Sequence, residues 1–412
     1  MKKFLRSRLF WLSFLAIISC QKNDSTPTST MTFLNNGTDA SYYTYWVAVS
    51  DQSGKVLAWK SLPTNVSTSL IYPTGKDPVN LTIIQKATGA DNYILTTYAN
   101  VAPGSYLSPS PYQAPTILGT YKVQCPSPTD YDYVIVNSES GSKSYVGTEY
   151  QVSVYANSSL FVSINKTGAQ VPRYLYIPQI SANGTVVIDQ TLYNSLPEMK
   201  SQNVSLSDNY AVYSVVGGKK SSSSNWSELS FFYSPNTNFP PIFYPDQIGT
   251  AFDEYQVFLA LIKPYITSSY SSTTNDLKDI SNYALQLFTP TLDAVNTVTT
   301  SNLDFTLSGN AHYVMTSFNS NTNSNNSWWY VYNPFSNKIS TVLPIFPDDL
   351  KKEVDLSFIN TMKVITITIE ENELNGYTGF YSNSILGEKE MVKNFKRKTY
   401  SSRSDGTIGG GG

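Results

Sequence analysis

Short runs of alternating apolar and polar residues recur along most of the chain and predict β-strands. They are rich in Val, Ile, Thr and Tyr and are bounded by Gly, Pro, Asn and Asp, which is the composition and punctuation typical of strands. Residues 43–50 (YTYWVAVS) are followed by the turn 51–54 and by 55–60 (KVLAWK), a pattern that predicts a hairpin. Further strands of this kind are expected at 80–85, 92–98, 131–136, 149–155, 160–164, 173–177 and 185–188.

Two longer runs extend the same pattern toward the C-terminus. Residues 361–370 (TMKVITITIE) place Lys363, Ile365, Ile367 and Ile369 on one face of a strand. Residues 252–262 (FDEYQVFLALI) fit both a helical stripe and strict alternation. The aromatic and β-branched residues around this second run favour a strand.

The architecture that these runs predict is all-β, with tandem β-sandwich domains that are Ig-like or similar. Stretches rich in Pro, Gly and Ser divide the runs at 103–115, 125–129 and 217–224. The expected units are a β-sandwich at 32–118, a second at 121–216, a flexible linker at 217–225, a β-rich domain at 226–394 and a disordered basic and Gly-rich tail at 395–412. No repeat of 20–50 residues indicates a propeller or a solenoid.

The N-terminus departs from this pattern. Four basic residues within the first eight positions precede an apolar run at 9–18. A charged segment followed by a short apolar one is the layout of a secretory signal. The run is too short to cross the bilayer, since a spanning helix needs about 20 residues.

The apolar stretch of the signal stops at Cys20, the last residue of the motif at 17–20 (IISC). This motif resembles the lipobox of bacterial lipoproteins. The resemblance implies that residues 1–19 are a signal peptide, that Cys20 becomes the lipid-carrying N-terminus, and that a further acyl chain such as palmitate caps it. Several acyl chains give stable membrane binding where one gives only marginal binding.

The segment that follows Cys20 is polar and rich in Ser and Thr. Residues 20–31 cannot build a core and are expected to act as a lipid-anchored tether. The tether is similar to those of Bacteroidetes-type surface lipoproteins. This likeness implies localisation at the cell outer membrane, facing either the surface or the periplasm, with the membrane itself as a partner through the anchor.

Charge and composition narrow the class of partner. The net charge of −2 includes the four basic residues of the signal, so the chain without residues 1–19 carries −6. A mildly acidic body argues against nucleic acid as a partner. Charged residues make up 14% of the chain, and 31 tyrosines contribute amphipathic surface in their place.

The sequence lacks the residues that common metal and nucleotide-cofactor sites need. His312 is the single histidine, which excludes His-based zinc sites, and no phosphate-binding glycine motif is present. We therefore expect no metal, no cofactor and no enzymatic activity. Cys125 is expected to be a small buried residue, and His312 to be hydrogen-bonded to backbone.

Carboxylate pairs leave glycoside hydrolysis as an open alternative. The candidates are neighbouring acidic residues, which solvated strand ends also explain. They are Asp253 with Glu254, Asp348 with Asp349, and Glu370 with Glu371 and Glu373.

Residues 319–332 (NSNTNSNNSWWYVY) are the strongest candidate for a binding surface. In a strand, Trp328, Tyr330 and Tyr332 point to one face and Trp329 to the other. One aromatic set must then face away from the core that the other fills, unless both faces are covered. Aromatic rings beside Asn325 and Asn326 are suited to bind a sugar, because rings supply apolar contact and amides bond hydroxyls.

These features predict a non-catalytic surface lipoprotein that binds or adheres through β-sandwich domains, with glycan as the ligand class. The alternative is a structural or accessory subunit of an outer-membrane protein complex. The oligomeric state and the identity of the ligand do not follow from the sequence.

The lipidation hypothesis predicts the effect of changing one residue. Replacing Cys20 with Ala removes the sulfur that would carry the lipid, so the protein should leave the membrane fraction. Mass spectrometry of the mature N-terminus checks this, and an unmodified Cys20 in the native protein would contradict it.

Overall fold

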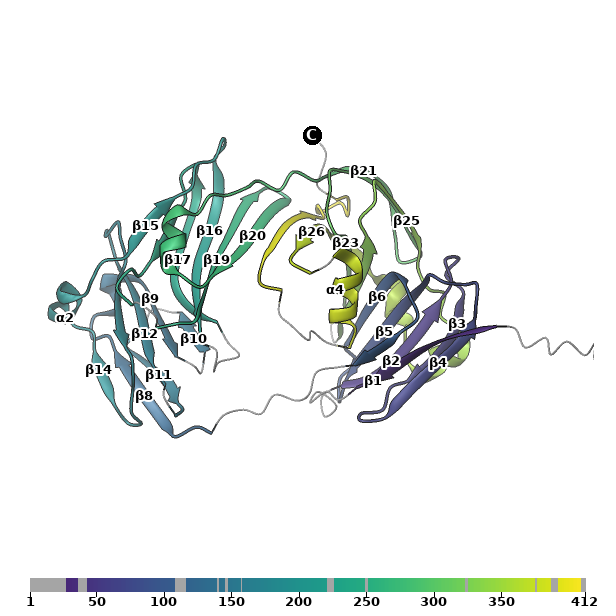
Figure 1. Ribbon diagram of the computed structural model, residues 1–412, viewed down its shortest axis with the longest axis horizontal. Helices are drawn as coiled ribbons and strands as arrows, with labels where there is room; N and C mark the ends of the chain where they lie inside the picture. The colour runs from purple at the N-terminus through teal and green to yellow at the C-terminus, as the bar shows by residue number, and fades with distance from the viewer. Residues whose placement is uncertain are drawn as a thin grey trace, which may run out of the picture.

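The fold is all-β, as the strand pattern predicts. The computed structural model describes residues 27–35, 43–107, 116–138, 141–144, 147–156, 158–220, 226–248, 251–322, 325–374, 376–386 and 392–408. These residues form 27 strands and three short α-helices, α2 (Gln190–Ser195), α3 (Asp348–Glu353) and α4 (Gly376–Ser384). Cys20, the signal and residues 21–26 of the predicted tether lie outside the described residues. The end of that tether is wrong, because Thr28 to Met31 begin strand β1 and Met31 is buried. In Figure 1 the strands form an arch with a lobe at each end.

The first lobe contains a β-sandwich. One of its sheets has the order β4 (Ser67–Pro73), β1 (Thr28–Leu34), β7 (Ser105–Leu107). It faces four strands, β2 (Tyr43–Ser50), β3 (Val56–Ser61), β5 (Val79–Ala87) and β6 (Tyr93–Val101). The core between them includes Met31, Phe33, Val47 and Leu81, all at most 1% exposed.

The second lobe contains another sandwich, whose strands begin near the predicted start at 121 but end at Val187, before the predicted end at 216. One sheet has the order β11 (Glu149–Val154), β8 (Gly119–Gln124), β14 (Thr185–Val187). The other has the order β10 (Gly141–Ser144), β9 (Tyr131–Ser138), β12 (Leu160–Lys166), β13 (Arg173–Ile177).

Cys125 belongs to the core of this second sandwich. It is a free cysteine and is fully buried, as expected. Burial raises the pKa of its thiol to about 11, so the sulfur stays protonated and unreactive near neutral pH.

The remaining strands follow in the second half of the chain. They are β15 (Lys200–Asn203), β16 (Tyr210–Lys219), β17 (Ser227–Thr237), β18 (Pro241–Tyr244), β19 (Glu254–Lys263), β20 (Ile266–Thr274), β21 (Thr291–Val298), β22 (Asn302–Ser308), β23 (Tyr313–Thr322), β24 (Asn325–Pro334), β25 (Lys338–Val342), β26 (Lys363–Asn372) and β27 (Phe395–Ser401). The run at 252–262 is therefore a strand, as its neighbourhood favoured.

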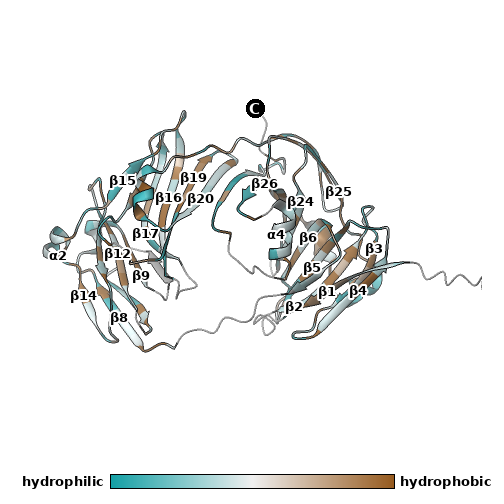
Figure 2. Cartoon of the chain, viewed as in Figure 1, coloured by the Kyte–Doolittle hydropathy of each residue, from teal (hydrophilic) through white to brown (hydrophobic). Residues whose placement is uncertain are grey.

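A twelve-stranded sheet joins the two lobes. Its order is β17-β16-β19-β20-β27-β26-β23-β24-β6-β5-β2-β3. All neighbours are antiparallel except β24 and β6, which pair in parallel with Trp328 opposite Ile94. Strands from the first and last thirds of the chain thus share one sheet. Figure 2 shows hydrophobic bands along several of these strands, including β5, β6 and β19.

The predicted boundary between the second domain and its linker is wrong, because it falls within a strand of this sheet. β16 continues through Gly217 and Gly218 to Lys219 and pairs with β17, so the second domain does not close at Val216 and the expected linker at 217–225 begins as strand. Gly218 serves close packing here, because a Cβ atom at this position would lie 2.7 Å from the ring of Phe252. Residues 221–225 lie outside the described part of the chain.

The predicted disordered tail at 395–412 is also wrong for its first part. Residues Phe395–Ser401 form β27, which pairs with β20 on one side and β26 on the other. Its basic side chains bond to groups on neighbouring elements: Arg397 pairs with Glu370, and the Lys398 amine donates to the carbonyl of Pro290. The basic side chains that suggested a solvated tail therefore make contacts within the fold.

The position of β27 predicts that the C-terminal residues are required for folding. A chain ending at Asn394 loses β27, which opens the edges of β20 and β26 and leaves the Glu370 carboxylate without Arg397. Removing one partner of a buried ion pair alone typically costs about 3–5 kcal/mol. We expect this truncated chain to be insoluble or to lack a cooperative thermal transition in circular dichroism.

A chain ending at Ile408 is the control, because it keeps β27 and the bridge between Ser402 and Ile408. It should melt within a few degrees of the full chain. A stable, cooperative fold in the chain ending at Asn394 would contradict the role given to β27.

Candidate functional site

Strand β24 lies inside the large sheet, between β23 and β6. Its residues alternate between the two faces, which we call the Trp328 face and the Trp329 face. Trp329 and Val331 are fully buried on the second, whereas Trp328 and Tyr330 are half-buried on the first. The two adjacent tryptophans thus lie in different environments, as their spacing requires.

Trp329 is a core residue. Its side chain is 0% exposed, and its indole Nε1 donates a hydrogen bond of 2.9 Å to Thr97 Oγ1 on β6. The ring packs against Phe318 and Phe346 at centroid distances of 6.2 Å each. Because the ring is packed and its indole N–H is hydrogen-bonded inside the protein, Trp329 does not contribute to a binding surface.

Trp328 and Tyr330 form a stacked pair on the opposite face. Their ring centroids are 5.9 Å apart and the ring planes differ by 2°. Partial burial raises the pKa of Tyr330, so the phenol remains a neutral hydrogen-bond donor. The parallel rings give this part of the sheet a flat aromatic surface.

Strand register places further side chains beside this pair. Opposite Trp328 stand Ile94 on β6 and Asn319 on β23, and the row continues from Ile94 to Gln85 and then to Tyr45. All five side chains are half-buried. We call this row, together with Tyr330, the aromatic–amide row; its members are Tyr45, Gln85, Ile94, Asn319, Trp328 and Tyr330.

Tyr332 does not join the row, although it lies on the same face. Helix α4 covers it, with the Phe380 ring at 5.0 Å, and Tyr98 stacks on it at 5.4 Å. The Tyr377 hydroxyl donates a 2.8 Å hydrogen bond to the Tyr332 carbonyl. Tyr332 is therefore part of the packing beneath α4.

The two predicted asparagines are placed at the start of β24. Asn326 is exposed, and its Oδ1 accepts a 2.7 Å hydrogen bond from Asn319 Nδ2. Its backbone N–H donates to Asn92 Oδ1 at 2.9 Å. Asn325 belongs to β24, but its side chain lies outside the described residues. The sequence argument missed Tyr45, Gln85 and Ile94, because they come from strands more than 200 residues earlier and only the register brings them together.

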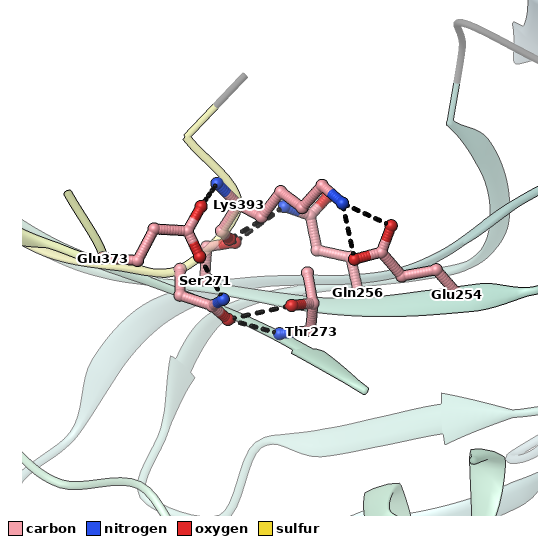
Figure 3. Close-up of polar contacts among 7 residues, drawn as sticks. Glu254, Gln256, Ser271, Thr273, Glu373 and Lys393 are labelled. Carbon is pink, nitrogen blue, oxygen red and sulfur yellow. Dashed lines mark hydrogen bonds and ion pairs between the residues drawn. The ribbon is translucent and has the colours of Figure 1, made fainter. Parts of the chain in front are cut away.

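The candidate catalytic carboxylates have structural partners. Figure 3 shows Glu254 bound to the Lys393 amine at 2.8 Å, and Glu373 accepting the Lys393 backbone N–H at 2.7 Å. Nearby, Thr273 donates its backbone N–H to Asn394 Oδ1 at 2.7 Å. These contacts fasten the segment that enters β27 to strands β19, β20 and β26.

The other carboxylates are engaged in the same way. Asp349 Oδ2 accepts from Trp59 Nε1 at 3.2 Å, Glu371 lies 3.7 Å from the Lys396 amine, and Glu370 pairs with Arg397. His312 Nδ1 accepts the backbone N–H of Asn372 at 3.3 Å, in agreement with the expectation that it bonds to backbone.

Metal ions in proteins are commonly held by clusters of histidine, cysteine and carboxylate side chains. Within the described ranges, no group of three or more such side chains is arranged to hold a metal ion.

Comparison with known proteins adds little to this picture. No family model matches the chain, and no curated protein matches it. A solved structure with some likeness is the native conformation of E. coli alpha-2-macroglobulin, at 10% identity and a TM-score of 0.13. The match covers 85% of this chain and 28% of that one, and a score this low carries no argument about fold or function.

The two tryptophans predict an asymmetry in stability. Trp329→Ala should lower the free energy of unfolding by about 3–5 kcal/mol, as expected for a fully buried large aromatic residue. Trp328→Ala should cost about 1 kcal/mol, because it removes one stacked, half-exposed ring. Urea unfolding followed by circular dichroism measures both values, and equal losses would contradict the assignment of the two faces.

Proposed function

We propose that this protein is a non-catalytic, lipid-anchored surface protein that binds glycan through the aromatic–amide row. The observation that carries the proposal is the parallel, partly exposed pair Trp328 and Tyr330, with the Asn319 amide opposite Trp328 and Gln85 two strands away in the same row. Two parallel rings in an otherwise packed sheet leave apolar surface in contact with solvent.

The chemistry of the row suits a sugar. The C–H faces of a pyranose ring pack on flat aromatic rings, and amide side chains donate and accept hydrogen bonds to hydroxyl groups. The row spans five adjacent strands, which are about 4.7–4.9 Å apart, so its length of about 19 Å suits several sugar units. None of its six members is charged, which fits an uncharged glycan.

The anchor in this proposal is the lipid on Cys20. The described residues contain no helix long and apolar enough to cross a bilayer. The polar residues 20–27 would then hold the arch away from a bacterial outer membrane, where the row is accessible to large ligands.

A glycan array with the detergent-purified full chain tests the proposal. Trp328→Ala and Tyr330→Ala should each weaken binding to a captured glycan by about tenfold or more, as is typical of aromatic anchors at a binding site. Tyr233→Ala is the matched control, since Tyr233 is a 54% exposed aromatic residue on the distant strand β17; it should bind like the native protein.

Two results would contradict this function. One is glycan binding that neither Trp328→Ala nor Tyr330→Ala alters. The other is the absence of glycan binding together with co-purification of an outer-membrane protein, which would favour an accessory subunit.

A further inference from the structure

A cavity of about 630 Å³ lies on the Trp329 face of the sheet, on the opposite side from the aromatic–amide row. Strands β19, β20 and β27 form its floor, and residues 287–293 form its wall. Its volume is within the range of about 300–1,000 Å³ that small-ligand sites occupy. We call it the Lys398 groove, after the residue that distinguishes it.

Lys398 places a positive charge in this groove with little to neutralise it. Its amine donates one hydrogen bond of 2.9 Å to the carbonyl of Pro290. An ammonium has three N–H donors, and no carboxylate of the described residues lies within ion-pair distance of this one. Burial lowers the pKa of Lys398, and no nearby charge offsets this effect.

The other charges of the groove already have partners. The Lys263 amine binds Asp208 at 3.0 Å and lies 4.5 Å from the centroid of the Tyr210 ring. Asp293 is exposed, and its Oδ1 accepts hydrogen bonds from Thr291 at 2.7 Å and Ser308 at 3.1 Å. Lys398 is thus the charged side chain of the groove that remains available to bind a ligand.

The walls are rigid and partly apolar. The Tyr270 and Tyr400 hydroxyls accept the backbone N–H groups of Phe288 and Leu292, each at 3.1 Å, which fixes the wall to the floor. Leu287 is 52% exposed at the rim. The groove therefore combines apolar surface with one cation, Lys398, that has no ion-pair partner among the described residues.

We propose that the Lys398 groove binds an organic carboxylate about the size of a sugar ring, with the carboxylate on the Lys398 amine. An anion restores the favourable interactions that burial removes from the ammonium, and charge-assisted hydrogen bonds are roughly twice as strong as neutral ones. The body of the ligand packs against Leu287 and the neighbouring apolar wall. This site is separate from the aromatic–amide row and does not depend on its function.

Calorimetric titration of the full chain in detergent tests the site with three probes. Glucuronate and hexanoate both carry a carboxylate, and glucose has the ring without the charge. Both carboxylates should bind and glucose should not, and binding of glucuronate alone would identify an acidic sugar as the preferred class. Lys398→Met should weaken carboxylate binding by about tenfold or more, as expected for losing a charged hydrogen-bond donor.

Lys396→Met is the matched control. Lys396 lies two residues earlier on the same face of β27, but its amine pairs with Glu371, so its replacement should leave carboxylate affinity within about twofold of the native value. Trp328→Ala should also leave it unchanged, which separates this site from the proposed glycan surface. Circular dichroism confirms that each variant is folded.

A second readout follows the amine itself. Bound glucuronate should raise the pKa of Lys398, measured by NMR of isotope-labelled lysine, because the anion stabilises the ammonium form. The proposal is overturned if Lys398→Met binds carboxylates as well as the native chain, if glucose binds equally, or if no carboxylate binds with a Kd below about 10 mM.

Discussion

The ion pair between the buried carboxylate of Glu370 and the partly exposed Arg397 holds the centre of the molecule together. Glu370 is 2% exposed, and its carboxylate accepts hydrogen bonds from Arg397 Nε at 2.6 Å, from Asn372 Nδ2 at 3.2 Å and from the Tyr313 hydroxyl. Burial and the adjacent carboxylate both raise the pKa of Tyr313, so its phenol remains a donor. A carboxylate at this depth is tolerated only when it is paired and hydrogen-bonded.

This requirement ties three strands to one another. Glu370 lies on β26, Tyr313 on β23 and Arg397 on β27, so the carboxylate is satisfied only when all three are in register. β27 in turn pairs with β20 and thereby joins the second lobe to the sheet. The arch in Figure 1 therefore depends on one strand of seven residues near the end of the chain.

Local patterns were sufficient to predict the strands but not their partners. Residues 43–50 and 361–370 match β2 and β26 closely, because alternation is a property of neighbouring residues. The prediction of separate domains was wrong, because the arrangement of domains depends on contacts between residues far apart in the chain. No local pattern records that Trp328 lies beside Ile94, or that Gly218 permits tight packing against Phe252 where a linker was expected.

Prediction of the candidate site was limited in the same way, because its surroundings come from distant parts of the chain. Alternation predicted that Trp328 and Trp329 face opposite sides, and the structure places them so. Alternation could not predict which face is covered. The cover is helix α4, which lies more than 40 residues further along the chain. It covers Tyr332 but leaves Trp328 partly exposed. Gln85 and Tyr45 were missed because two strand pairings separate Gln85 from Trp328 and three separate Tyr45 from it.

The parallel pairing of β24 with β6 has a consequence for how the chain reaches this state. The paired residues Ile94 and Trp328 are 234 positions apart, and closing so long a loop is an entropic cost that slows folding. The sandwich of strands β1–β7 needs only residues 28–107 and that of strands β8–β14 only residues 119–187, so both can form early. The arch must wait for β27, so a chain released before β27 is made carries two finished sandwiches and open sheet edges, the kind of surface that aggregates or attracts proteases.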